Sequence, residues 1–280
     1  MQIKKVDSHQ HFWDLKRFNY EWMSPDDQIL YRDFLPKNFE PILQKTQIEK
    51  VVAVQAHQSV EETIWLLKLA DEFDFIGGVV GWVDLQSENL NEQLTKFSKH
   101  PKFKGVRHIV QDEPKDDWIL QPKVIKGINQ LSDFNLTYDI LIFPKHLKYF
   151  PQLVENCPQV SFVIDHLAKP PIAAGEIIDW KKDLKAVAKF PQIYCKLSGM
   201  VTEANHQNWT REDLLPYFET VLELFGTKRL MFGSDYPVCL LAANYEKVLD
   251  TYQSFLKDLS EDGQDQIMGE NARQFYKLDY

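Results

Sequence analysis

The sequence is poor in cysteine and contains no long apolar run. Its three cysteines, Cys157, Cys195 and Cys239, are far apart and form no Cys-x-x-Cys pair. This is typical of a reducing compartment and argues against a metal site built from cysteines. No stretch approaches the roughly 20 apolar residues of a membrane span. The start of the chain, MQIKKVD, lacks the apolar segment of a signal peptide. We therefore expect a soluble, cytoplasmic protein.

Positive charge is also scarce. The chain has 32 lysines and arginines against 41 aspartates and glutamates, which gives a net charge of −9. A surface of this kind does not suit nucleic acid or an anionic membrane. A small molecule remains a suitable partner, because a few basic side chains inside a cleft can outweigh distant acidic groups that salt screens. We leave a homodimer open as the oligomeric state.

Apolar residues make up 44% of the 280 residues, enough for a large globular core. Eight short apolar runs rich in β-forming residues cover residues 3–9, 50–56, 76–83, 103–110, 136–143, 160–166, 193–198 and 229–235. Segments with helical periodicity separate them, at residues 61–73, 90–100, 124–131, 146–155, 180–190, 214–225 and 245–256. Ser59 and Glu62 have the spacing of a capping box at the start of the first of these helices.

Strands that alternate with helices at this spacing must pair in parallel through crossover connections. Eight such units without a break in composition predict a closed (β/α)₈ TIM barrel that forms a single domain over residues 1–280. A doubly wound open sheet is the alternative, but the sequence has neither G-x-G-x-x-G after the first strand nor a phosphate-binding P-loop. We expect the proline-containing stretch Trp13–Pro41 to fold over the barrel mouth.

Polar side chains stand where several predicted strands end, which is where barrel enzymes carry their catalytic groups. The first run ends in Asp-Ser-His-Gln-His, so that His9 and His11 lie two residues apart and point to the same side. The sixth run ends at His166 and the eighth at Asp235. These four residues are ligand or proton-transfer types, and they predict a site at the barrel mouth.

Ordered motifs along the whole chain make the sequence similar to the amidohydrolase superfamily, and most similar to its amidohydrolase-2 branch, which includes sugar-lactone and pyrone-dicarboxylate lactonases. The motifs are V-D-S-H-Q-H-F-W-D at 6–14, G-W-V-D at 81–84, K-G-V-R-H at 104–108, F-V-I-D-H-L-A-K-P at 162–170, K-L-S-G at 196–199, F-G-S-D-Y-P at 232–237 and E-N-A-R-Q-F-Y at 270–276. The resemblance implies a (β/α)₈ hydrolase in which Asp235 activates water and His166 helps to polarise the substrate carbonyl.

The sequence departs from the two-metal pattern of that superfamily. The fourth run shows no bridging lysine at its end, and the fifth run supplies no histidine. We therefore expect at most one divalent ion, with zinc favoured, held by His9, His11, His166 and Asp235. The resemblance leaves open a metal-independent enzyme, in which the two histidines of the first strand would only hydrogen-bond the substrate.

Further residues at predicted strand ends and loops are candidates for substrate contact. Arg107 can clamp a carboxylate or the lactone carbonyl, because a guanidinium binds pairs of oxygens with a planar fork. The other candidates are polar residues near strand ends and aromatic residues on or beside loops of the barrel mouth: Gln55, His108, Tyr138 and Lys196, and Trp13, Tyr20, Trp22 and Trp82.

The leading interpretation is a lactonase of carbohydrate catabolism that opens an aldonolactone, such as fucono- or rhamnono-lactone, with water activated by Asp235; the sugar rests on the resemblance. The alternative is a metal-dependent, non-oxidative decarboxylase of an unsaturated or aromatic acid, which uses the same scaffold and residue types. A third class is a barrel that binds a ligand without catalysis.

Overall fold

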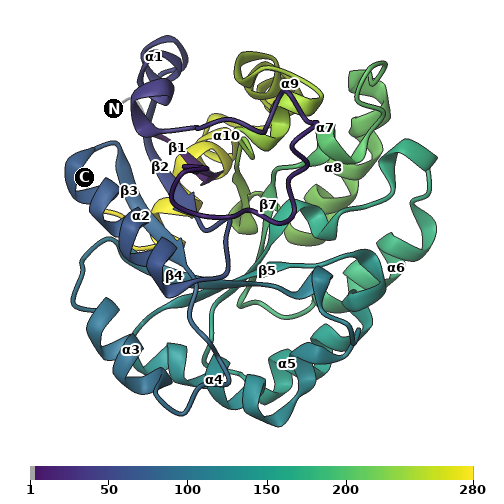
Figure 1. The fold of residues 1–280 in the computed structure, drawn as a ribbon. Coiled ribbons are helices and arrows are strands. Elements are labelled where there is room, and N and C mark those ends of the chain that lie inside the picture. The colour runs from purple at the N-terminus through teal and green to yellow at the C-terminus, as the bar shows by residue number, and fades with distance from the viewer. Residues whose placement is uncertain (1–3, 280) are drawn as a thin grey trace.

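Eight parallel strands form one barrel in the computed structural model, which describes residues 4–279 (Figure 1). Their order in the sheet is their order in the chain: β1 (Lys5–Gln10), β2 (Ile48–Val54), β3 (Ile76–Gly81), β4 (Phe103–Ile109), β5 (Thr137–Leu141), β6 (Phe162–Ile164), β7 (Ile193–Leu197) and β8 (Leu230–Phe232). Each strand lies within one of the predicted apolar runs or overlaps it, although Ile3 lies outside the described residues. The predicted (β/α)₈ fold is confirmed.

The barrel closes between β1 and the segment that follows β8. The amide of Asp235 donates to the carbonyl of His9 at 2.9 Å, and the amide of His11 donates to the carbonyl of Tyr236 at 2.7 Å. A bridge between Gln10 and Tyr236 continues this parallel pairing. Closure therefore joins the first-strand and eighth-strand motifs directly.

Helices surround the sheet (Figure 1). The longer ones are α1 (Pro36–Thr46), α2 (Val60–Glu72), α3 (Leu90–Phe97), α4 (Pro122–Asp133), α5 (Phe150–Asn156), α6 (Ile178–Val187), α8 (Arg211–Phe225) and α9 (Tyr245–Leu256); the short ones are α7 (Met200–Glu203), α10 (Glu261–Asp265) and α11 (Asn271–Phe275). All seven predicted helices are present. α1 and the three short helices were not predicted. Pro36 occupies the first turn of α1, where a missing N–H costs nothing.

The segment between β1 and α1 is a packed lid at one end of the barrel (Figure 1, purple). Trp13 pairs with Phe34 in an antiparallel bridge, and the Trp13 indole N–H donates to the carbonyl of Arg32 at 2.7 Å. Further along, the Trp22 indole N–H donates to the carbonyl of Ala56, just after β2, at 2.9 Å. The aromatic side chains of this segment thus anchor it against itself and against the loop between β2 and α2.

Glu62 at the start of α2 links the lid to that loop. The Ser59 hydroxyl caps α2 by accepting from the Glu62 amide at 3.1 Å, as predicted. The Glu62 carboxylate does not complete a capping box. It accepts instead from the amides of Ala56 and His57, at 3.0 and 2.8 Å, and from the Tyr20 hydroxyl at 3.1 Å.

The interior of the barrel contains both an apolar cluster and buried charges. Valines from β1, β2, β3 and β6 pack with Met231 of β8 and with Phe275 and Tyr276 of the C-terminal segment in an apolar cluster. The buried charged residues include Asp139, Asp165 and Lys196, and the Tyr276 hydroxyl donates to Asp139 at 2.7 Å. None of the described helices is long and apolar enough to cross a membrane.

Candidate active site at the barrel mouth

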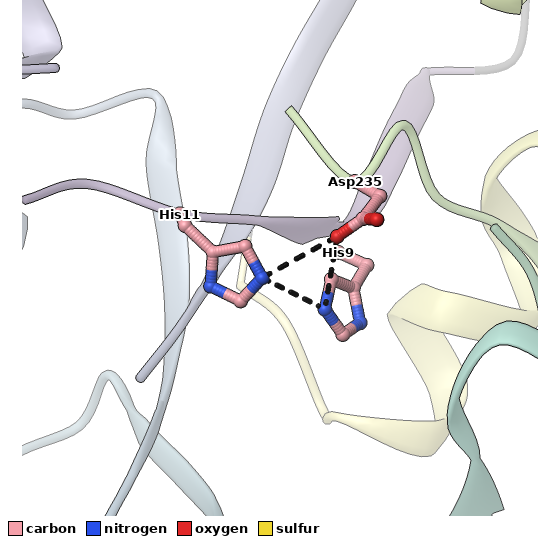
Figure 2. A group of neighbouring side chains, drawn as sticks. All are labelled: His9, His11 and Asp235. Atoms are coloured by element: carbon pink, nitrogen blue, oxygen red, sulfur yellow. Dashed lines mark hydrogen bonds and ion pairs between the residues drawn. The ribbon is translucent and has the colours of Figure 1, made fainter. Parts of the chain in front are cut away.

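His9, His11 and Asp235 turn their side chains toward one point, as Figure 2 shows. The Nε2 atoms of His9 and His11 are 3.1 Å apart. Asp235 Oδ1 lies 3.5 Å from the Nε2 of His11 and 3.8 Å from that of His9. The period-two placement of the histidines and the closure of the barrel at Asp235 bring the three groups together, as the sequence predicts.

These separations fit a metal ion. Bonds of about 2.0–2.1 Å at tetrahedral angles place two ligand atoms roughly 3.4 Å apart, close to the distances within the trio. The fourth predicted residue also reaches the site, because His166 Nε2 lies 3.7 Å from Asp235 Oδ1. Imidazole nitrogens with one carboxylate oxygen are a donor set that divalent transition metals bind.

A second group of ligand atoms, from His9, Asp165 and His166, also lies close together. Lys196 Nζ, however, is 3.0 Å from Asp165 Oδ1 and 3.1 Å from His9 Nδ1. The Lys196 ammonium group therefore already compensates the charge of Asp165, and a second cation would be repelled here. Within residues 4–279 the arrangement accordingly fits one ion at the His9, His11 and Asp235 trio.

Neighbouring groups determine which imidazole nitrogens carry hydrogen. His11 Nδ1 lies 2.7 Å from the carbonyl of Val54, which can only accept, so Nδ1–H donates and Nε2 keeps its lone pair. The neighbours of His9 are mixed: the acceptor Asp165 Oδ1 and the donor Lys196 Nζ lie 3.3 and 3.1 Å from Nδ1, and the donor Arg107 Nη1 lies 3.3 Å from Nε2. The contacts with Asp165 and Arg107 agree with a hydrogen on Nδ1 and a lone pair on Nε2. His166 Nδ1 lies 2.8 Å from the Ser198 hydroxyl, which both donates and accepts, so His166 can use either nitrogen as the donor.

Burial keeps the site in the charge state that a cation binds. Desolvation lowers the pKa of His9 and His11 and brings the pKa of His166 to about 4, so the three rings are neutral near pH 7. Burial alone would raise the pKa of Asp235, but the imidazoles around it, with His166 foremost, hold that pKa below its ordinary value. The site therefore presents neutral nitrogens and one carboxylate.

Backbone strain concentrates at the same place. His166, Leu167, Ala168 and Lys169 form four successive left-handed residues with φ between 52° and 59°, and Asp235 has φ 59°. A left-handed conformation costs a residue with a side chain roughly 1–2 kcal/mol, and such strain tends to mark functional sites. Gly199 permits the arrangement, because a Cβ there would lie 2.7 Å from the His166 ring.

A layer of buried charges supports the site from below. Arg107 donates to Asp165 Oδ2 at 3.1 Å and to the Gln55 side chain at 3.1 Å. Lys196 pairs with Asp139 at 2.5 Å as well as with Asp165. The Asp165 carboxylate thus lies between two cations, which keep its pKa well below the usual value despite burial.

A cavity of about 310 Å³ opens above this layer. His11, His166, Asp235 and Arg107 line it together with side chains from the lid and the later loops: Trp22, Leu30, Ala56, Ile109, Gln111, Asp112, Leu141, Lys169, Thr202, Glu203, His206, Val238 and Leu241. A small organic molecule is the ligand that a cavity of this volume accepts.

Only some of the predicted substrate-contact residues line this cavity. Trp22 and Arg107 line it. Gln55 and Lys196 are wholly buried beneath it, where they hold Arg107 and Asp165.

Five others do not line the cavity and have partners elsewhere. Trp13 packs under Trp22, and Tyr20 donates to Glu62. The Trp82 indole donates to His108, which stacks on Trp118 with ring centroids 4.0 Å apart. Tyr138 is fully buried, and its hydroxyl has no hydrogen-bond partner within residues 4–279.

Several cavity residues were not among the predicted site residues: Gln111, Asp112, Lys169, Thr202, Glu203 and His206. Lys169 stands in the D-H-L-A-K-P motif, and its position three residues after His166 was the available signal. For the others, the loop conformations that place them leave no comparable mark in the sequence.

The barrel with its polar mouth defines an enzyme that works at the C-terminal ends of its strands. The chain belongs to the amidohydrolase family, whose model it matches over residues 6–278. Two L-fucono-1,5-lactonases, from Burkholderia ambifaria and Burkholderia multivorans, are 35% and 34% identical to it. The alignments cover 98% and 99% of this chain and 96% and 97% of those proteins.

Solved structures agree with this assignment. An amidohydrolase from Burkholderia multivorans with bound zinc is 32% identical to this chain and has a TM-score of 0.94. The superposition covers 99% of this chain and 100% of that one. A dihydroxybenzoic acid decarboxylase from Polaromonas with bound manganese has a TM-score of 0.72 at 12% identity, with 100% of this chain and 98% of that chain covered. That second likeness shows the fold alone.

Proposed function

We propose that this protein is a lactonase that opens the ring of a sugar aldonolactone, with L-fuconolactone as the first substrate to test. The observation that carries the proposal is that the Asp235 carboxylate, His166 and Arg107 line one cavity of about 310 Å³. The names of the relatives at 35% and 34% identity support the choice of substrate.

Asp235 is the proposed general base and acid. It is ionised at neutral pH because nearby imidazoles lower its pKa. It accepts a proton from water as the hydroxide adds to the lactone carbonyl. It then returns the proton to the ring oxygen as the carbon–oxygen bond breaks. One carboxylate serves both steps, so the enzyme ends each cycle in its starting state.

Arg107 and His166 are placed to stabilise the negative charge that develops on the carbonyl oxygen. Arg107 is held rigidly by Asp165 and Gln55. When the Ser198 hydroxyl donates to Nδ1 of His166, Nε2–H is free to donate to the substrate. Fixed donors and charges aimed at a developing oxyanion are worth several kcal/mol in other enzymes, about 3–4 for a single donor.

We propose further that one divalent ion, zinc, binds at His9, His11 and Asp235 with His166 nearby. When bound, such an ion lowers the pKa of a water molecule and polarises a carbonyl. Elemental analysis of the purified protein tests the stoichiometry, and two ions per chain would contradict this proposal.

A panel of lactones followed by proton release near pH 6.5 tests the function. We expect hydrolysis of L-fuconolactone or a related aldonolactone, measured on protein as purified, after chelation and after addition of zinc. Hydrolysis of no lactone, together with release of carbon dioxide from an unsaturated or aromatic acid, would replace the proposal with a decarboxylase.

A further inference from the structure

The left-handed turn after β6 places two side chains in the cavity. His166 and Lys169 stand three residues apart, and both line the wall. The left-handed backbone of residues 166–169 brings the second side chain round to the space that the first one faces. Because this backbone is unfavourable for residues with side chains, the turn is a costly way to position Lys169.

Lys169 has an acidic partner from a different loop. Its Nζ lies 3.6 Å from Oε1 of Glu203 at the end of α7, and the two side chains are only 20% and 23% exposed. Burial raises the pKa of Glu203, and the charge of Lys169 opposes that rise. A separation of 3.6 Å is longer than a direct hydrogen bond, so both groups keep donor and acceptor capacity toward a ligand.

We propose that Lys169 and Glu203 bind neighbouring hydroxyl groups of the substrate and thereby select a polyhydroxylated lactone over a plain one. A hydroxyl group both donates and accepts, so one diol can satisfy the ammonium and the carboxylate together. A lactone without hydroxyls would displace water from the pair and leave it unsatisfied, which is how polar pockets reject apolar analogues. The inference rests on the proposed lactonase function.

The test compares two substrates in the same variants. The ratio of kcat/KM for L-fuconolactone to kcat/KM for δ-valerolactone, which carries no hydroxyl, is measured for the wild type, Lys169→Met and Glu203→Gln. We expect this ratio to fall about 10- to 100-fold in each variant, the effect of losing a charged hydrogen bond, with a rise in KM for L-fuconolactone. Lys169→Arg keeps the donors and the charge and should restore most of the ratio.

A matched control is the exposed pair of Lys181 and Glu223, 2.7 Å apart. Lys181→Met removes an ion pair of the same type whose two residues do not line the cavity, and it should not alter the ratio. Thermal melting shows whether each variant is folded, and Glu203→Gln decides the question if Lys169→Met does not fold.

Two results would overturn the inference. One is an equal loss of kcat/KM on both lactones, which would mean a structural role for the pair. The other is an unaltered ratio in folded variants. If the wild type hydrolyses neither lactone, the lactonase proposal itself fails, and the inference fails with it.

Discussion

Asp165 faces the ring nitrogen of His9 that points away from His11 and Asp235. Its Oδ1 atom lies 3.3 Å from His9 Nδ1, and both side chains are wholly buried. A carboxylate in this position accepts from Nδ1–H and leaves Nε2 to face His11 and Asp235, where we propose that the ion binds. Asp165, which directly follows β6, therefore positions His9 of β1.

Asp165→Asn should weaken metal binding. An amide group presents N–H hydrogens either to His9 or to Arg107, and both of these partners need an acceptor. We expect zinc affinity to fall about 10- to 100-fold, as is typical when such a partner is lost. Competition with a chromophoric chelator measures it. Asp116→Asn, at a half-exposed aspartate paired with Lys145, is the control. Wild-type affinity in a folded Asp165→Asn protein would contradict the role of Asp165.

The site residues at the strand ends could be predicted, because the two-residue periodicity of strands and the closure of the barrel determine where these residues lie. His9 and His11 converge because alternate residues of a strand face one side, and Asp235 joins them because a barrel must pair its first and last strands. The role of Asp165 was not predicted. It follows β6 directly. The left-handed turn that begins at His166 makes the side chains of Asp165 and His166 point in different directions, and the sequence does not show this turn.

The positions of side chains on the mouth loops were harder to predict from the sequence. Trp13 looks like a ligand platform in the sequence, but the bridge to Phe34 draws it under Trp22. Lys169 could not be placed, because its position depends on four successive left-handed residues that the side chains themselves disfavour. His166, Leu167 and Ala168 of this turn are buried, and a sequence pattern does not report the packing around them.

Glu62→Gln should change how stability depends on pH. Burial raises the pKa of Glu62 from 4.5 to about 7. Protonated Glu62 therefore stabilises the folded state below pH 4.5, and this stabilisation is lost as the pH rises toward 7. Relative to the wild type, the free energy of unfolding of Glu62→Gln should increase over this range by up to roughly 3 kcal/mol.

Urea unfolding at pH 4.5, 5.5, 6.5 and 7.5 measures the difference between the two proteins. Glu61→Gln is the matched control, because Glu61 is the preceding residue and is exposed. It removes the same carboxyl group from an exposed place on the same turn of α2, so the effect of Glu62→Gln is measured relative to it. A constant difference between the two variants would mean that Glu62 titrates normally in the folded protein.

Gly199→Ala should disturb His166. Gly199 has φ 67°, and an added Cβ would lie 2.7 Å from the His166 ring. We expect a loss of about 1–3 kcal/mol in the free energy of unfolding from the left-handed backbone and the clash, together with a clear fall in kcat/KM on the lactone.

Gly175→Ala separates these two causes. Gly175 has φ 68°, but no atom lies within 4 Å of the added Cβ. This variant should lose only the backbone contribution to stability and should keep its activity. If Gly199→Ala and Gly175→Ala have the same effects on stability and activity, close packing against His166 is unimportant.

Asp235→Asn is the direct test of the base. The substitution keeps the size of the side chain and removes its charge and proton affinity. Because asparagine tolerates the left-handed backbone that Asp235 adopts at φ 59°, the fold should survive. We expect kcat for lactone hydrolysis to fall about 10²- to 10⁴-fold, the usual contribution of general acid–base catalysis.

Substrate affinity and metal content decide what that loss means. If the carboxylate acts mainly in the transition state, the variant should bind the substrate within roughly tenfold of the wild type. Metal analysis of the same sample shows whether the ion was lost with the charge, and Asp258→Asn, at an exposed aspartate, controls for the substitution itself. Near wild-type turnover by folded Asp235→Asn would remove Asp235 from the chemistry and make His166 the next base to test.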